Sequence, residues 1–327
     1  MPVAVAPNAS LDASSTGASV ADAAAISRRD ASEETSERAA LTASAEKTAA
    51  SELLFPIAGD GAVAPACPDV ECLIAARYAS DEKAKVLALD LFARTGTVAG
   101  LEVEHIMNGG YRGMLHLVPE LPIDRERVHL ERVASSLLDF DKFFGALEAD
   151  GGPKVTYRWR RLALRFFRSV RARTPSAYAI GWTVAYNLSG SLNGSPDSVR
   201  ETMFHEIFHL NDGAHGKSAR DWSNGAVGPI YDAIVAKCGA RTPCLAPYSP
   251  NSTMVRGGTF YSFQPGNDVR EYAAELAVRY YREQRGMLGQ GPRVTPAFKC
   301  GPPENARAWR LFVAEFFGDI DRTLPCP

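Results

Sequence analysis

A His-Glu-x-x-His pentad, residues 205–209, constrains this chain more than any other feature. On a helix, residues four apart lie on one face, so the imidazoles of His205 and His209 can bind a single metal ion. Glu206 follows the first histidine and can accept a proton from a water held at the metal. The chain has six histidines, and three of them fall between residues 205 and 215. The pattern therefore predicts a Zn²⁺ site on a helix.

The residues around the pentad predict a helix that is anchored in the core. Ser195 is suited to cap its N-terminus, Pro196 to occupy its first turn, and Gly213 to end it in a left-handed conformation. Apolar residues recur at steps of three and four, namely Val199, Met203, Ile207 and Leu210. The alternative, a surface helix with two solvated histidines, is disfavoured because it needs no such stripe.

A catalytic zinc site normally has three protein ligands, and the sequence offers several candidates for the third. Glu271 and Glu275 lie four residues apart on a second predicted helix, so one can bind the metal while the other orients a ligand histidine. His215, ten residues after His205, has the spacing of a metzincin ligand, but Asp212 stands where metzincins have a glycine. Glu271 is the preferred third ligand, with His215 or Glu275 as alternatives.

The chain resembles a known peptidase family over residues 195–285. The pentad, Asp212 seven residues after the first histidine, and the Glu-Tyr-Ala-Ala-Glu sequence of residues 271–275 are similar to the catalytic domain of anthrax lethal factor and its relatives. The resemblance implies His205, His209 and Glu271 as zinc ligands and Glu206 as general base. It further implies Tyr261 as the hydrogen-bond donor to the oxyanion, with Glu275 and Asp212 as carboxylates behind the ligands.

This resemblance implies a zinc endopeptidase of the gluzincin type, with one Zn²⁺ per chain. The expected fold is α+β, a zincin-like domain in which the active-site helix packs on a small mixed sheet. A peptide substrate is expected to pair with an edge strand near Ala179–Tyr186. Two alternatives remain open: a zinc hydrolase of another amide, such as one in peptidoglycan, and a zincin-fold module that binds peptide without cleaving it.

Length and composition favour one catalytic domain with an N-terminal appendage. Residues 1–50 are rich in Ala and Ser without an aromatic residue, which predicts disorder with a transient helix over Glu33–Leu54. Residues 51–95 are predicted to be a helical region and residues 96–327 the catalytic domain. The 36 basic and 38 acidic residues leave the chain near neutrality, and no apolar run is long enough for a membrane span.

Six cysteines favour an oxidising compartment and therefore secretion, although no signal peptide is visible. Their spacing makes local pairing the simplest arrangement: Cys67–Cys72, Cys238–Cys244 and Cys300–Cys326. Six reduced thiols in a cytosolic protein are the alternative. A zinc site built from these cysteines is disfavoured because no Cys-x-x-Cys pair exists.

The periodicity of the remaining sequence predicts alternating helices and strands. A hairpin is expected at Asn108-Gly109-Gly110, between strands over 98–107 and 111–118. Further strands are expected over 155–170 and 178–188, and helices over 69–95, 124–147, 229–237, 268–287 and 304–317. The arginine-rich run 158–168 is interpreted as a half-solvated strand rather than a nucleic-acid surface, and no nucleic-acid partner is expected.

Overall fold

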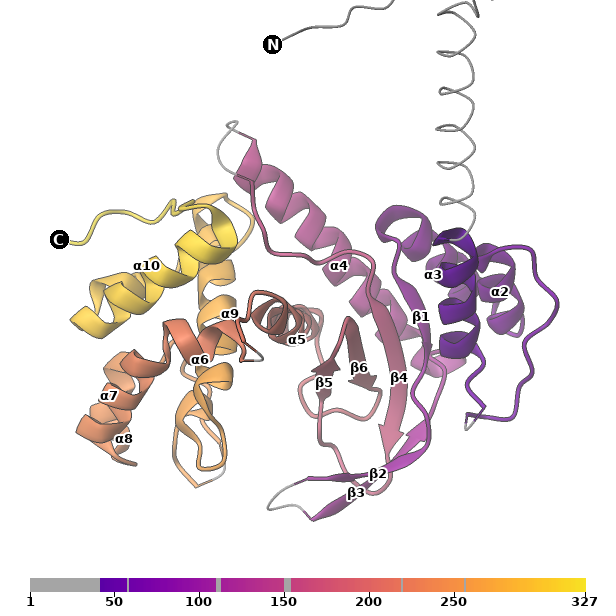
Figure 1. Ribbon diagram of the computed structural model, residues 1–327, viewed down its shortest axis with the longest axis horizontal. Helices are drawn as coiled ribbons and strands as arrows, with labels where there is room; N and C mark the ends of the chain where they lie inside the picture. The colour runs from indigo at the N-terminus through magenta and orange to yellow at the C-terminus, as the bar shows by residue number, and fades with distance from the viewer. Residues whose placement is uncertain (1–41, 58, 110–112, 150–153, 219, 256) are drawn as a thin grey trace, which may run out of the picture. The chain divides into compact units, whose positions relative to one another are not determined.

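The computed structural model describes residues 42–327 except 58, 110–112, 150–153, 219 and 256 (Figure 1). Two compact units are distinguished, residues 1–48 and 49–327. The described part of the first unit, residues 42–48, is helical. The predicted disorder of residues 1–50 therefore falls mostly outside the described residues, and the described residues 42–50 belong to the region where a helix was expected.

The larger unit has the mixed helix and strand content that the sequence predicted. Its described strands form one mixed sheet in the order β2-β3-β4-β6-β5, with β1 paired to β4. These strands are β1 (Val98–Leu101), β2 (His105–Asn108), β3 (Met114–Pro119), β4 (Ala163–Ser169), β5 (Ala177–Ile180) and β6 (Thr183–Asn187). β1 and β6 run parallel to β4, whereas β2 with β3, β3 with β4 and β5 with β6 are antiparallel. Strand β5 forms one edge of this sheet and borders the same cleft as the predicted metal ligands.

Three predicted strands were wrong in their extent. The strand expected over 98–107 is two strands, β1 and β2, which pair with β4 and β3 respectively. The strand expected over 155–170 is paired only over β4, because Arg161 adopts a left-handed backbone (φ 56°) just before it. The strand expected over 178–188 is a hairpin, because Gly181 (φ 57°) turns the chain between β5 and β6. Only β5 of this hairpin lies at the sheet edge, since β6 lies between β4 and β5.

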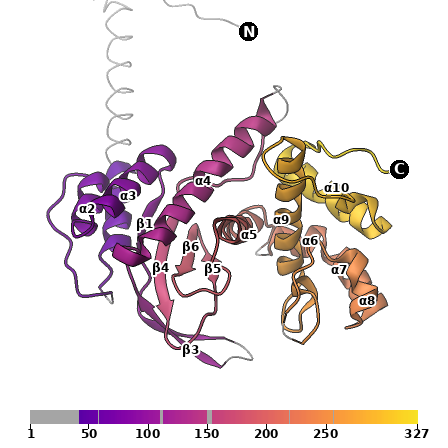
Figure 2. The same cartoon turned by 180° about the vertical axis from the view of Figure 1, so that it is seen from behind.

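The predicted helical ranges are confirmed, with 69–95 divided into two helices, whereas the short helices over 222–226 and 242–245 were not predicted. The helices are α2 (Val70–Arg77), α3 (Glu82–Thr95), α4 (Arg127–Glu148), α5 (Pro196–Ala214), α6 (Trp222–Ala226), α7 (Gly228–Cys238), α8 (Thr242–Leu245), α9 (Val269–Met287) and α10 (Pro303–Phe317). Short 3₁₀ turns are η2 (Asp124–Glu126), η3 (Ala246–Tyr248), η4 (Tyr261–Phe263) and η5 (Phe298–Cys300). Figures 1 and 2 both place α5 between the β5–β6 end of the sheet and α9, and α5 contacts α4, α9 and β5.

An aromatic cluster fixes α5 against its neighbours. The ring of Phe204 on α5 stacks on Tyr281 of α9 at 4.4 Å, and Phe143 of α4 meets Tyr281 edge-on at 4.8 Å. Tyr157 stacks on Phe204 from the other side at 4.9 Å and donates a hydrogen bond to its carbonyl oxygen. Burial of each such side chain contributes about 1.5–3 kcal/mol. The cluster thereby sets the distance between the two helices that carry the predicted metal ligands.

All six cysteines lie in the described part of the chain and form the three predicted disulfides: Cys67–Cys72, Cys238–Cys244 and Cys300–Cys326. The third joins the end of η5 to the residues after α10. Disulfides of this number are typical of proteins that fold in an oxidising environment. Across the described residues, no helix is both long and apolar enough to cross a bilayer.

Candidate metal centre

The helix α5, which carries the pentad, begins as its sequence predicts and ends later. The Ser195 hydroxyl accepts a hydrogen bond from the backbone N–H of Ser198, and Pro196 occupies the first turn. The predicted end at Gly213 was wrong, because the helix continues through Ala214. After the helix ends, the chain has no room for a side chain at Gly216, because an added Cβ would lie 2.2 Å from the carbonyl oxygen of Arg220.

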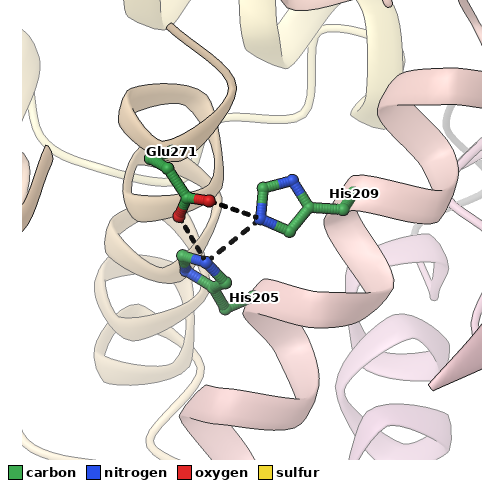
Figure 3. A group of neighbouring side chains, drawn as sticks. All are labelled: His205, His209 and Glu271. Carbon is green, nitrogen blue, oxygen red and sulfur yellow. Dashed lines mark hydrogen bonds and ion pairs between the residues drawn. The ribbon is translucent and has the colours of Figure 1, made fainter. Parts of the chain in front are cut away.

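The helix directs one face of the pentad toward α9, where Glu271 lies in the first turn (Figure 3). His205 Nε2 lies 3.1 Å from Glu271 Oε2 and 3.2 Å from His209 Nε2. His209 Nε2 lies 3.6 Å from Glu271 Oε1. Within the described ranges, these three side chains are the group whose ligand atoms lie close enough together to hold a metal ion, all within 4.8 Å of one another.

The spacing of the three ligand atoms suits zinc. Zn–N and Zn–O bonds of about 2.0–2.2 Å in a tetrahedron separate neighbouring ligand atoms by about 3.3–3.5 Å. His205 Nε2 lies slightly closer than that to Glu271 Oε2 and to His209 Nε2, at 3.1 and 3.2 Å, and His209 Nε2 lies 3.6 Å from the other carboxylate oxygen, Glu271 Oε1. Two imidazoles and one carboxylate are also a donor set that Zn²⁺ uses in catalytic sites.

The charges around His205 favour a cation at this position. Burial by itself would lower the pKa of His205, but the carboxylates of Glu271 and Glu275 raise it well above its ordinary value. Burial likewise opposes the charge of Glu271, yet its hydrogen bonds with the two histidines hold its pKa well below the usual range. In the metal-free protein a proton on His205 therefore balances these carboxylates, and a metal ion would replace it.

Glu206 lies next to this cluster and is buried. Removal from water raises its pKa above the usual range, and the nearby Glu271 carboxylate adds to the shift, while His205 and His209 oppose it. A carboxylate with a raised pKa is a stronger proton acceptor. The predicted general base is therefore placed beside the ligands in an environment that suits its predicted role.

Glu275 is one helical turn beyond Glu271 and contacts the other nitrogen of the first histidine. Its Oε1 lies 3.5 Å from His205 Nδ1, and its Oε2 accepts a hydrogen bond of 2.9 Å from the amide of Asn251. Arg282 donates to the oxygen of the same amide at 2.9 Å and is paired with Glu201. This chain of contacts orients the His205 ring.

Asn251, Arg282 and Glu201 were not among the residues predicted for the site. Asn251 lies in a loop between η3 and η4, and loops carry no periodic signal that would connect it to α9. Arg282 and Glu201 look like ordinary helix-surface charges in the sequence. Only the packing of α5 against α9 brings them behind the ligands.

Two predicted residues lie apart from the three ligands. Asp212 accepts hydrogen bonds from the backbone N–H and hydroxyl of Ser223, at 2.7 and 2.6 Å, and so holds the start of α6. Burial raises the pKa of Asp212 to about 6. His215 Nδ1 lies 2.7 Å from Glu315 on α10, and its ring packs on Phe316 at 4.8 Å. His215 is therefore not positioned as the third ligand.

A cleft of about 500 Å³ opens over the three ligands. Glu206 and Tyr261 both line it, and the Tyr261 ring lies 5.9 Å from that of His205. Burial and the neighbouring carboxylates, Glu271 first, raise the pKa of the Tyr261 phenol well above its usual range, so it is a hydrogen-bond donor at neutral pH. The opposite wall is the edge strand β5 and its turn, residues 177–182.

No family model matches the chain, and no curated protein or solved structure is significantly similar to it.

Proposed function

We propose that this chain is a secreted zinc-dependent endopeptidase of the gluzincin type, with a zincin-like catalytic domain. One observation carries the proposal: the ligand atoms of His205, His209 and Glu271 converge within 4.8 Å beside the buried carboxylate of Glu206. The edge strand β5 along the same cleft supports a peptide as the substrate. The disulfides support an extracytoplasmic location.

Each residue then has a defined task. His205, His209 and Glu271 would hold the ion, and the contact of Glu275 with His205 fixes the ring that binds it. When bound, Zn²⁺ supplies a Lewis acid that polarises the scissile carbonyl and lowers the pKa of water to about 7. Glu206 accepts the proton of the attacking water and then donates it to the leaving amine.

The cleft walls would position the peptide. An extended substrate can pair its backbone with the free edge of β5, which leaves its scissile bond over the pentad on α5. The phenol of Tyr261 remains protonated and donates a hydrogen bond to the oxyanion as the carbonyl carbon becomes tetrahedral.

Replacing Glu206 by Gln tests the proposal, because Gln keeps the size of the side chain but cannot accept the proton. Cleavage of a peptide library should fall at least about 100-fold while the protein retains about one zinc per chain, measured by elemental analysis. The matched control is Glu131→Gln, an exposed glutamate on α4. Undiminished cleavage by Glu206→Gln would refute the proposal.

The same protein incubated with purified cell wall tests the other amide as substrate. Release of cell-wall fragments without cleavage of any peptide would favour the peptidoglycan hydrolase. Zinc-dependent peptide binding without cleavage of either material would favour the non-catalytic module.

A further inference from the structure

A second cavity, of about 560 Å³, has four arginines among the nine residues that line it. Arg158, Arg160 and Arg161 come from the segment before β4, and Arg94 comes from the last turn of α3. We call these four residues and the cavity between them the arginine groove. Glu71 is the single carboxylate in its lining. The groove therefore has a strong excess of positive charge.

The charges in the arginine groove are only partly balanced. Arg160 pairs with Asp141 at 2.9 Å, and Arg94 lies 3.5 Å from Asp90. In the described part of the chain, neither Arg158 nor Arg161 forms an ion pair with a carboxylate. Burial lowers the pKa of Arg158, and the charge of Arg161 lowers it further. Two guanidinium groups thus lack a negative partner.

The local backbone holds Arg158 firmly in place. Its guanidinium donates hydrogen bonds to the carbonyl oxygens of Arg160 and Arg161, at 3.2 and 2.9 Å. The left-handed conformation of Arg161 (φ 56°) is uncommon for a residue with a Cβ. The backbone of Arg158 is also bound to the side chain of Asn211 on α5, through hydrogen bonds of 2.7 and 2.9 Å. The groove is a preorganised site tied to the active-site helix.

The arginine groove adjoins the proposed catalytic cleft. Val98, Ala163 and Thr183 are aligned in the sheet, so the residues just before β1, β4 and β6 lie at the same end of their strands. Strand β5 finishes at this end of the sheet too, because Ile180 is paired with Thr183. Arg158 stacks on the ring of Trp182 at 3.9 Å, and Trp182 lines the catalytic cleft. The Arg158–Trp182 pair is therefore a wall shared by both cavities.

We propose that the arginine groove binds the carboxylate side chains of an acidic segment of the substrate, beyond the C-terminal end of β5. The proposal rests on the proposed peptidase function and adds a substrate class to it. A peptide that leaves the cleft past Trp182 meets Arg158 next, and the two unpaired guanidinium groups suit carboxylates. Acidic residues several positions from the scissile bond would therefore select the substrate.

A single-stranded nucleic acid fits the groove less well. Such ligands need exposed aromatic faces on which their bases can stack. Here the Trp182 ring is covered by Arg158, and Trp159 stacks on Phe144 at 4.0 Å. Phe92, which lines the groove, is half-buried and packs against the core. The groove thus offers an excess of positive charge but no row of exposed rings, which favours an acidic peptide.

Cleavage of matched peptides tests the proposal. One cleavable peptide is extended at either end by Glu-Glu-Gly-Glu after spacers of different length, and the reference peptides carry Gln-Gln-Gly-Gln. The best acidic peptide should have a kcat/KM at least about tenfold above its Gln reference at low salt, with the ratio falling at higher salt. Arg161→Asn should bring the ratio to about one, since Asn tolerates the left-handed backbone.

Arg171→Asn is the matched control, because Arg171 is also exposed and left-handed (φ 57°) but lies outside the groove. It should keep the wild-type ratio. A ratio near one in the wild-type protein for every spacer would overturn the proposal, as would equal ratios in the wild-type protein and Arg161→Asn.

Direct binding separates this proposal from the peptidase function. A fluorescein-labelled peptide of Glu and Gly should bind the wild-type protein by anisotropy, and Arg161→Asn should lose that binding. Such binding without any peptide cleavage would support the groove and refute the peptidase. Cleavage of the Gln peptides without acidic-peptide binding would do the reverse. Tighter binding of a labelled oligo(dT), also lost in Arg161→Asn, would overturn the proposal in favour of nucleic acid.

Discussion

Two histidine–glutamate pairs join α5 to neighbouring helices, one through His205 within α5 and one through His215, the residue that caps its C-terminal end, and they differ in what surrounds them. His205 is 3.1 Å from Glu271, and a second histidine and a second carboxylate also lie within 3.5 Å of its ring nitrogens. His215 is 2.7 Å from Glu315 and otherwise packs on an aromatic ring. The shorter contact belongs to the pair that we do not assign to metal binding.

The difference shows that a candidate metal centre is distinguished by several ligand atoms that meet at one place, and not by the length of a single contact. A lone His–carboxylate pair is satisfied by one proton and joins α5 to α10. The His205 cluster gathers two imidazoles and two carboxylates, so it has more ligand atoms than one proton can satisfy. Breaking each pair separately is therefore the most direct test of the comparison.

The largest effect is expected from Glu271→Ala, which removes one of three proposed ligands. Its zinc affinity, measured by competition with a chromogenic chelator, should fall by more than about 100-fold, beyond the usual effect of removing a group that only orients a ligand. Glu315→Ala breaks the other pair and should leave the affinity within about twofold. If His215→Ala strips the metal while Glu271→Ala retains it, His215 is the third ligand and the comparison is reversed.

The next effect concerns Asp212, which lies on α5 between the two pairs. Its folded-state pKa of about 6 is above the unfolded value of 3.8, so its protonated form stabilises the fold below pH 4. That contribution is lost as the pH rises through 6, by about 3 kcal/mol in total. In chelator-treated protein, the wild type should therefore lose up to that amount of stability between pH 4 and 7, and Asp212→Asn should not. The free energy of unfolding of the variant minus that of the wild type should rise by the same amount over this range. Parallel pH profiles from urea denaturation would show that the Asp212 pKa is not raised.

The smallest effect is expected for the contacts that orient the His205 ring through Glu275. Asn251→Ala removes the hydrogen bond to Glu275 and should lower zinc affinity about tenfold. Asn305→Ala is the matched control, because Asn305 is an equally buried amide that bonds to carbonyl oxygens away from the ligands. Both variants should lower the melting temperature. Equal zinc affinities for the two variants would mean that Asn251 only supports the fold.

The elements of the site could be predicted from sequence because their signals are local. The Ser195–Pro196 start, the apolar stripe of α5 and the spacing of Glu271 and Glu275 each lie within one helix. Local spacing also sufficed for the pairing of the six cysteines, which the structure confirms. Helical periodicity and short loops leave few alternatives of comparable energy.

What could not be predicted depends on contacts between distant segments. Asn251 reaches Glu275 only because a loop folds over α9, and no spacing in the sequence connects them. The break at Arg161 escaped prediction because apolar and polar residues alternate on both sides of it, at odd positions over 155–159 and at even positions over 162–166. The shift between the two patterns falls at two consecutive arginines, and a left-handed arginine has no sequence signature. The same break turned an expected strand face into the arginine groove.

The separation of His205 and Glu271 by 66 residues has a consequence for how the protein matures. During synthesis, the two histidines leave the ribosome well before the glutamate that completes their set. A helix with two histidines alone binds zinc weakly, and closing the intervening loop costs conformational entropy that the aromatic packing of α5 on α9 must offset. Tight zinc uptake would then occur only in chains whose C-terminal half has folded. Metal content would thus report the completion of folding.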